Sequence, residues 1–197
     1  DEISDTDITL FNGQPVISYR NNAGRYEVAI FDGDQWERTT VVEHASAGIH
    51  TEISVLNGQL VTAYTQGRDL KFATRQVNGN WSIVNADAPR RSVGREADLT
   101  VYNGEPVIAH RDFTLGQLRI SRRTNGQWQT RALVPQNGEY GFRPSVLVYE
   151  EGIRVFHGTV PDDEDQSSDG TQWYVYGPID AVDYQQFSFD QSAGGGQ

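Results

Sequence analysis

The stretch Asp7–Arg20, DITLFNGQPVISYR, decides the fold, because the chain repeats it. The later copies are EISVLNGQLVTAYT at Glu52–Thr65, DLTVYNGEPVIAHR at Asp98–Arg111 and a weaker SVLVYEEGIRVFHG at Ser145–Gly158. The copies therefore start 45 residues (7 to 52), 46 residues (52 to 98) and 47 residues (98 to 145) apart. Self-similarity at a period of about 20 to 50 residues is typical of solenoids, propellers and other repeat arrays.

Each unit is predicted to hold four short antiparallel strands. The first is an alternating run, at Ile8–Phe11, Ile53–Leu56, Leu99–Tyr102 and Val146–Tyr149. An Asn-Gly pair follows it in three units and suits a two-residue hairpin, because both turn positions need positive φ. The second strand is expected at Val16–Tyr19, Val61–Tyr64, Val107–His110 and Arg154–His157, and the third at Tyr26–Phe31, Leu70–Thr74 and Leu118–Arg122. The fourth starts at a Trp in three units, Trp36, Trp81 and Trp128.

The repeat predicts the fold class. No stretch shows the apolar period of a helix, and four short strands with a large aromatic at a fixed place are typical of a propeller blade. We therefore predict an all-β fold, a four-bladed β-propeller with blades at about residues 7–50, 51–96, 97–143 and 144–190. A β-sandwich would explain the strands but not the period. Either the four blades close by themselves, or the chain is part of a larger propeller.

The fourth unit departs from the pattern. Its second and third strands are joined by a long acidic connection, PDDEDQSSDG at 161–170. We place its last two strands at Trp173–Tyr176 and Tyr184–Phe189. Residues 191–197 are predicted to be a Gly-rich tail or linker.

Composition narrows the classes of partner. The 197 residues carry a net charge of −11, which repels phosphate backbones and anionic lipid, so nucleic acid and membrane insertion are not expected. Cysteine is absent, which removes disulfides, thiolate metal sites and cysteine nucleophiles. Methionine is absent too, so we expect a processed chain or a piece of a longer one.

The first strand, the Asn-Gly turn, the Pro-Val-Ile and Tyr-Arg run and the Gly-x-Trp turn together resemble the repeats of secreted bacterial β-propellers. The resemblance is to the broad sialidase or BNR-like group and covers residues 7–142 best. Its signature Ser-x-Asp-x-Gly-x-x-Trp is only approximated, with wrong spacing, at Ser168–Trp173. The resemblance implies a propeller that serves as a lectin, a lyase, a glycosidase or a plain scaffold.

Equivalent residues of successive blades form rings about the propeller axis, and the first ring is acidic. Asp7, Glu52 and Asp98 stand at the start of the innermost strands, where converging carboxylates would attract calcium or magnesium. The alternative is three solvated acids. The acidic loop offers Asp163, Asp165 and Asp169 at spacings like those of an EF-hand, but it lacks the glycine and the closing glutamate of that motif.

A second ring holds Tyr19, Tyr64, His110 and His157, with Arg111 beside it. Tyr64, His110, Arg111 and His157 could abstract a proton in a polysaccharide lyase, or they could pack between blades with polar tips. Trp36, Trp81 and Trp128 could likewise stack on sugar rings, or anchor one blade against the next.

These features lead to three functional hypotheses, since a propeller fold does not choose among its uses. The first is a non-catalytic module of an extracellular or cell-surface protein that binds a protein or glycan partner through its loops, with calcium or magnesium as possible bound ions. The second is a fragment of a polysaccharide-acting enzyme, either a lyase or a glycosidase. The third is a structural subunit of a larger extracellular assembly of several chains.

Overall fold

The structure, a computed structural model, describes residues 3–133, 139–149, 152–160, 172–176 and 184–188. Every regular element in these residues is a β-strand, and the pairs are antiparallel. The described part of the chain therefore has no helix, and so none that is long and apolar enough to cross a membrane. The predicted all-β class is confirmed.

Each of the first three units folds as one four-stranded sheet, with the strands in chain order. The first sheet holds β1 (Ile3–Phe11), β2 (Gln14–Asn21), β3 (Arg25–Phe31) and β4 (Trp36–Glu43). The second holds β5 (Ile49–Leu56), β6 (Gln59–Gln66), β7 (Asp69–Arg75) and β8 (Trp81–Asp87). The third holds β9 (Arg95–Tyr102), β10 (Glu105–Asp112), β11 (Gln117–Thr124) and β12 (Gln127–Ala132).

The hairpins follow from local turn chemistry. Both residues of the first Asn-Gly pair have positive φ, 52° at Asn12 and 79° at Gly13, and the pairs at 57–58 and 103–104 repeat these values closely. Two such residues twist the chain in the hand that antiparallel strands require. The Asn-Gly turns predicted from the sequence are confirmed.

The fourth unit differs from the others. β13 (Glu139–Tyr149) pairs with β14 (Gly152–Val160), and β15 (Gln172–Tyr176) pairs with β16 (Tyr184–Ser188), but the two pairs are separate sheets. The repeat predicts one four-stranded sheet here. A tight turn fixes the register of the third strand in the first three units. In the fourth unit the connection is residues 161–171, which lie outside the described residues.

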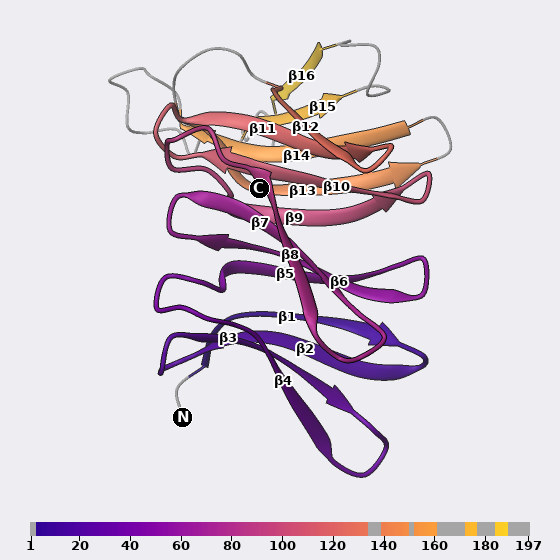
Figure 1. Ribbon diagram of the computed structural model, residues 1–197. Coiled ribbons are helices and arrows are strands. Elements are labelled where there is room, and N and C mark those ends of the chain that lie inside the picture. Colours follow the sequence, from indigo (N-terminus) through magenta and orange to yellow (C-terminus); the bar gives the residue numbers. More distant parts are fainter. Residues whose placement is uncertain (1–2, 134–138, 150–151, 161–171, 177–183, 189–197) are drawn as a thin grey trace, which may run out of the picture.

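The sheets stack face on face (Figure 1), and the core lies between them. We call the side of a sheet that meets the following unit its front face, and the side that meets the preceding unit its rear face. The first interface buries Val16, Tyr26 and Val28 of the first front face against Ile53 and Tyr64 of the second rear face. Two further clusters repeat this arrangement, between the second and third units and between the third and fourth.

A glycine in each link lets consecutive units approach. Gly48, Gly94 and Gly141 all have positive φ, between 73° and 80°. A Cβ on Gly94 would lie 2.8 Å from the Cβ of Leu70, and one on Gly48 would lie 2.8 Å from the Cβ of Tyr26. These positions therefore need glycine for conformation and for space.

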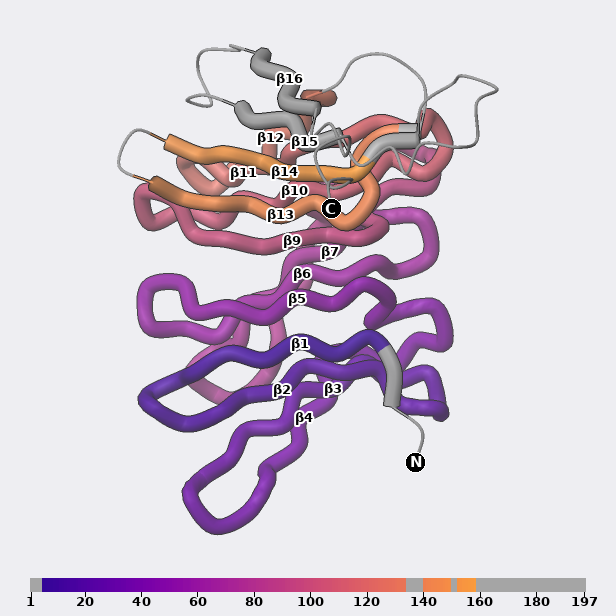
Figure 2. The backbone as a smooth tube through the Cα atoms, turned by 180° about the vertical axis from the view of Figure 1, so that it is seen from behind, coloured from indigo at the N-terminus to yellow at the C-terminus, as the bar shows by residue number. Residues whose placement is uncertain are grey.

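The stack is open. The first sheet and the strands of the fourth unit lie at its opposite ends in both views (Figures 1 and 2). The described residues thus form an array of propeller-like units, and they do not form a closed ring of four.

Candidate functional site

The predicted acidic ring lies on the inner strands β1, β5 and β9. Asp7 Oδ2 accepts a hydrogen bond of 2.7 Å from the backbone N–H of Ile53 in the next unit. Asp98 Oδ2 accepts one in the same way from the N–H of Val146. Two of the three carboxylates therefore tie the first strand of one unit to the first strand of the following unit.

Glu52, the third member of the ring, is held in its neutral form. Burial raises the pKa of its carboxyl to about 9, and the negative charges of Asp7 and Asp98 raise it further. A protonated carboxyl is a poor ligand for calcium or magnesium, which prefer charged oxygen ligands. In the described ranges, no group of three or more His, Cys, Asp or Glu side chains could hold a metal ion. The geometry thus gives this ring a structural role.

The second predicted cation site cannot be placed. Its residues, Asp163, Asp165 and Asp169, lie outside the described residues.

A further ring was not recognised from the sequence. Asp5, His50, Glu96 and Arg143 each interrupt the first strand of their unit with a β-bulge and have φ between 43° and 51°. Asp5 Oδ1 accepts a 3.2 Å hydrogen bond from the N–H of His50, and Glu96 Oε2 accepts a 2.6 Å bond from the N–H of Arg143. The only feature of the sequence that could have indicated this ring is the repeat spacing. The hydrophobic pattern does not predict a positive φ at Asp, His, Glu or Arg.

The predicted proton-transfer residues are buried between units. His110 and His157 are 0% exposed, and each Nδ1 lies at hydrogen-bond distance from the N–H of a link glycine, 3.2 Å to Gly94 and 3.1 Å to Gly141. Burial lowers the pKa of His110 to about 3 and also lowers that of His157. Both imidazoles are therefore neutral and are parts of the interfaces.

Tyr64 and Arg111 are buried as well. Tyr64 is 0% exposed and stacks on Tyr26 with ring centroids 4.6 Å apart, and burial raises its pKa. Arg111 donates from Nε to the carbonyl of Tyr140 at 3.0 Å, and its guanidinium lies 3.8 Å from the ring centre of Phe142. The sequence allowed two interpretations of these residues, proton abstraction or packing between blades. These contacts fit packing between blades, with each side chain hydrogen-bonded or stacked.

The three tryptophans lie on the rear faces of their sheets. Trp128 meets Phe72 of the preceding unit edge-on, at 5.1 Å, and Trp81 packs on the first interface. Trp36 has no preceding unit within the described residues and is 42% exposed. Trp81 and Trp128 therefore join units, and Trp36 is the one of the three with an open ring.

One exposed aromatic stands among cations at the end of the third unit. Phe113 is 48% exposed, and the Arg95 guanidinium lies 3.7 Å from its ring centre. Arg111 approaches the same ring at 5.5 Å and also lies over Phe142. We call Arg95, Arg111, Phe113 and Phe142 the loop-face cluster. It combines the accessible ring of Phe113 with the partly exposed guanidinium of Arg95, while Arg111 is buried.

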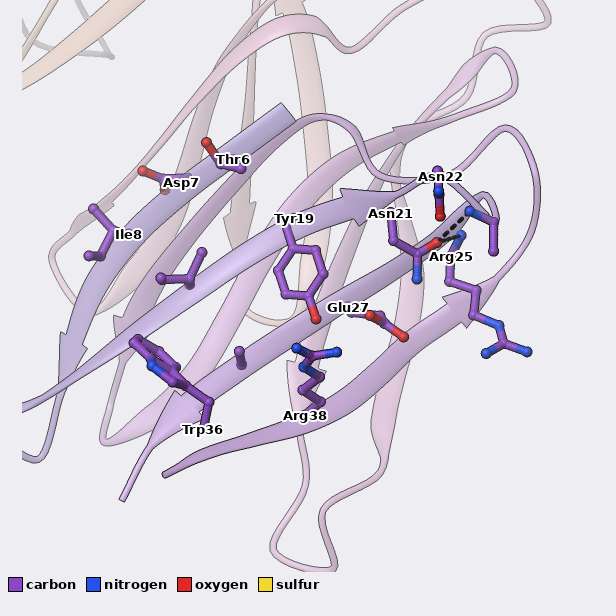
Figure 3. A pocket seen from close by; sticks show the side chains of 13 residues that line it. Thr6, Asp7, Ile8, Tyr19, Asn21, Asn22, Arg25, Glu27, Trp36 and Arg38 are labelled. Carbon is purple, nitrogen blue, oxygen red and sulfur yellow. Dashed lines mark hydrogen bonds between the residues drawn. The ribbon is translucent and has the colours of Figure 1, made fainter. Parts of the chain in front are cut away.

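A hollow of about 910 Å³ covers the rear face of the first sheet (Figure 3). Tyr19, Glu27, Trp36 and Arg38 lie around it, together with Ile8 at one side. It is a further place where a partner could bind.

Comparisons with known proteins identify the fold but no family. No protein-family model and no curated protein matches the chain. A solved structure of the lectin SapL1 in complex with α-methyl fucoside matches 89% of this chain with a TM-score of 0.61 and 14% identity. An exo-β-1,3-galactanase from Phanerochaete chrysosporium, solved with β-1,3-galactotriose, matches 94% of it with a TM-score of 0.62 and 10% identity.

Both solved structures have propeller-type folds, so the likeness places this chain in that structural class. The chain spans 60% of the length of the lectin chain and 50% of that of the galactanase chain. At these identities the likeness concerns the fold alone.

Proposed function

We propose that this chain is a glycan-binding part of a β-propeller in a secreted or cell-surface protein. The observation that carries the proposal is its likeness, over 89% of its length, to a lectin solved with a bound fucoside. The open stack supports an origin in a propeller with more than four blades. A protein partner and a structural role in an assembly are the alternatives that the fold also allows.

The loop-face cluster is the proposed sugar site. A half-exposed ring such as Phe113 offers an apolar face for the C–H groups of a sugar, while a guanidinium presents up to five N–H donors in a rigid fork. The Arg95 guanidinium already lies 3.7 Å from the centre of this ring. The four residues of the acid–base hypothesis are buried, so the enzyme alternative receives no support from them.

Binding of the purified chain to a glycan array, followed by calorimetric titration with methyl fucoside and β-1,3-linked galactose oligomers, tests the proposal. We expect Phe113→Ala and Arg95→Ala each to weaken binding about tenfold, equivalent to about 1.4 kcal/mol. Val77→Ala is the matched control, since Val77 is fully exposed in the β7–β8 turn, at the other end of the strands. Absence of binding to every glycan would overturn the proposal, and unchanged affinity of both cluster variants would overturn the assignment of the site.

A further inference from the structure

The same contact between a link and the turn beside it occurs twice in the molecule. In the first case the N–H of Gly67 donates to the carbonyl of Ser46 at 3.1 Å. In the second case the N–H of Phe113 donates to the carbonyl of Ser92 at 2.9 Å. In both links a glycine with positive φ stands two residues after the serine. The two places can therefore be compared side chain by side chain.

The second place has gained cations and an aromatic ring. The residue before the serine is alanine in the first link and arginine in the second, and the residue after the glycine is isoleucine in the first and arginine in the second. These pairs are Ala45 and Arg91, and Ile49 and Arg95. In the turns, glycine at 67 corresponds to Phe113. Because small and apolar residues serve in the first place, the contact itself does not require the two guanidinium groups.

The carboxylate nearest to Phe113 in the chain is occupied by the turn and by Arg91. Asp112 Oδ1 accepts hydrogen bonds from the N–H groups of Thr114 and Leu115, each at 3.1 Å. Asp112 Oδ2 accepts one from Arg91 Nε at 2.5 Å. The residue is 0% exposed. It therefore holds the turn that presents Phe113, and its oxygens are not open to solvent.

Two further arginines keep their charge available. Arg90 is exposed, and Arg95 is half-buried with its guanidinium 3.7 Å from the ring centre of Phe113. Within the described ranges, neither forms a salt bridge with a carboxylate. Glu96, the acid next to Arg95 in the chain, already accepts a hydrogen bond from the N–H of Arg143 at 2.6 Å. The surface around Phe113 is thus locally cationic.

This local charge contrasts with the charge of the whole chain, which is −11. Repulsion between exposed charges is largely screened beyond about 8 Å at physiological ionic strength. A guanidinium in contact with an oxyanion instead forms short, charge-assisted hydrogen bonds in a fixed fork. The arginines in contact with a ligand therefore decide which charge this site prefers.

We propose that the loop-face cluster, together with Arg90 on the neighbouring link, recognises glycans that carry a carboxylate or a sulfate group. The inference rests on the proposed function, because it names the class of sugar that the same site would take. Phe113 contacts the C–H face of a sugar ring, while Arg95 and Arg90 donate hydrogen bonds to the oxyanion. Carboxylate and sulfate share this chemistry, and the test separates them.

Calorimetric titration of the purified chain with oligosaccharides of equal length tests the inference. The ligands are neutral β-1,3-galactose oligomers, galacturonic acid oligomers and sulfated galactose oligomers. We expect at least one of the charged ligands to bind about tenfold more tightly than the neutral one in about 0.05 M sodium chloride, and the difference to shrink in about 0.5 M, because salt screens the charges. Tighter binding of the uronate alone or of the sulfated ligand alone identifies the oxyanion.

Variants of the two arginines provide a second test. Arg95→Gln and Arg90→Gln should each remove most of the preference for the charged ligand and change the affinity for the neutral one less. His44→Gln, an exposed side chain in the first link, is the matched control and should keep the preference. Because Arg90 is exposed, its variant is informative even where Arg95→Gln lowers the thermal midpoint.

The outcomes separate this inference from the proposed function. Equal affinity for charged and neutral oligomers would overturn the acidic class of ligand and leave glycan binding standing. A preference that persists in both arginine variants would overturn the role given to these residues. Absence of binding to every oligomer and to every glycan of the array would overturn the proposed function, and this inference with it.

Discussion

The interface between the first and second sheets and the interface between the second and third use equivalent positions for different chemistry. In the first, Tyr64 stacks on Tyr26, whose hydroxyl bonds to Thr51 and Thr62. In the second, His110 stands where Tyr64 stands, and its Nε2 lies 2.9 Å from Ser121 Oγ. At this position the first interface has an aromatic pair and the second has a polar contact.

A buried ionic network lies in the second interface, in addition to its apolar cluster. Arg119 donates from Nε to Asp87 Oδ2 at 2.8 Å, and its Nη1 lies 3.9 Å from Asp112 Oδ2. Arg91 pairs with the same carboxylate at 2.5 Å, and His110 Nε2 lies 3.7 Å from Asp87. Asp112 is 0% exposed, so a fully buried carboxylate lies within reach of two guanidinium groups.

The repeat therefore preserves the geometry of an interface but not the chemistry of the side chains within it. The backbone registers and the link glycines are the same, and they set the spacing of the sheets. Within that spacing either an aromatic pair or an ionic network can satisfy the buried groups. The two interfaces should therefore respond differently to mutation and to pH.

The largest expected effect is loss of the ionic network. Arg119→Met leaves Asp87 without the guanidinium it binds and removes one cation from Asp112, and breaking a buried pair in this way costs about 3–5 kcal/mol of unfolding free energy. Urea denaturation measures the loss. Arg25→Ala is the control, because its pair with Glu43 is exposed and is expected to contribute less than about 1 kcal/mol. Equal losses in the two variants would contradict the role of the network.

Substitution of the link glycines should affect both interfaces alike. Gly48→Ala and Gly94→Ala combine positive φ, at about 1 kcal/mol or more, with a clash in a packed core at about 1–3 kcal/mol. Gly58→Ala has the same φ but no heavy atom within 4 Å of its new Cβ, so it should show only the first cost. The comparison uses the thermal and urea midpoints of the three variants. If Gly58→Ala is as harmful as the other two, close approach is not the reason for glycine in the links.

Removing the hydroxyl groups of Tyr26 and Tyr64 in turn should show how much each contributes to the stability of the first interface. Tyr26→Phe removes an oxygen bonded to two threonines and should cost about 1–2 kcal/mol. Tyr64→Phe removes an oxygen that is buried without a partner, and it should leave stability unchanged or increase it. Urea midpoints of the two variants decide the question. A larger loss in Tyr64→Phe than in Tyr26→Phe would refute the assigned hydrogen bonds.

The last effect concerns pH. The pKa of Glu52 is raised to about 9 in the folded chain from an ordinary value near 4.5, so the folded state binds more protons between these values. Its contribution is complete below about pH 4.5 and is lost as the pH rises towards 9. Glu52→Gln should therefore match the wild type at pH 5 and be more stable at pH 8. Parallel stability curves for the two chains across this range would contradict a neutral Glu52.

Much of the fold was predictable because the repeat displays local rules three times over. The Asn-Gly pairs fixed the first hairpins, and the Trp after the second turn marked the start of the fourth strand in the first two units. In the fourth unit, whose connection is long, the predicted strands Trp173–Tyr176 and Tyr184–Phe189 match β15 and β16 closely, but not their sheet. Register there is not set by a short turn, so sequence pattern could not supply it.

The predicted sites show the limit of the same reasoning. The repeat correctly grouped Asp7, Glu52 and Asp98, and it grouped the Tyr and His positions, but it could not tell what faces them. The bonds from Ile53 and Val146 to two of the carboxylates, and the burial of His110, depend on the neighbouring unit. Phe113 stood outside every repeated motif, and its contact with Arg95 joins the turn after β10 to the start of β9.

The number of units, the order of their strands and the face on which each side chain lies follow from the repeat, because strand period and turn chemistry are local properties. Which faces are covered depends on how the units stack in the tertiary structure. Burial depends on the neighbour that a sheet receives, so identical positions become a packed core at Ile53 and an open surface at Ile8.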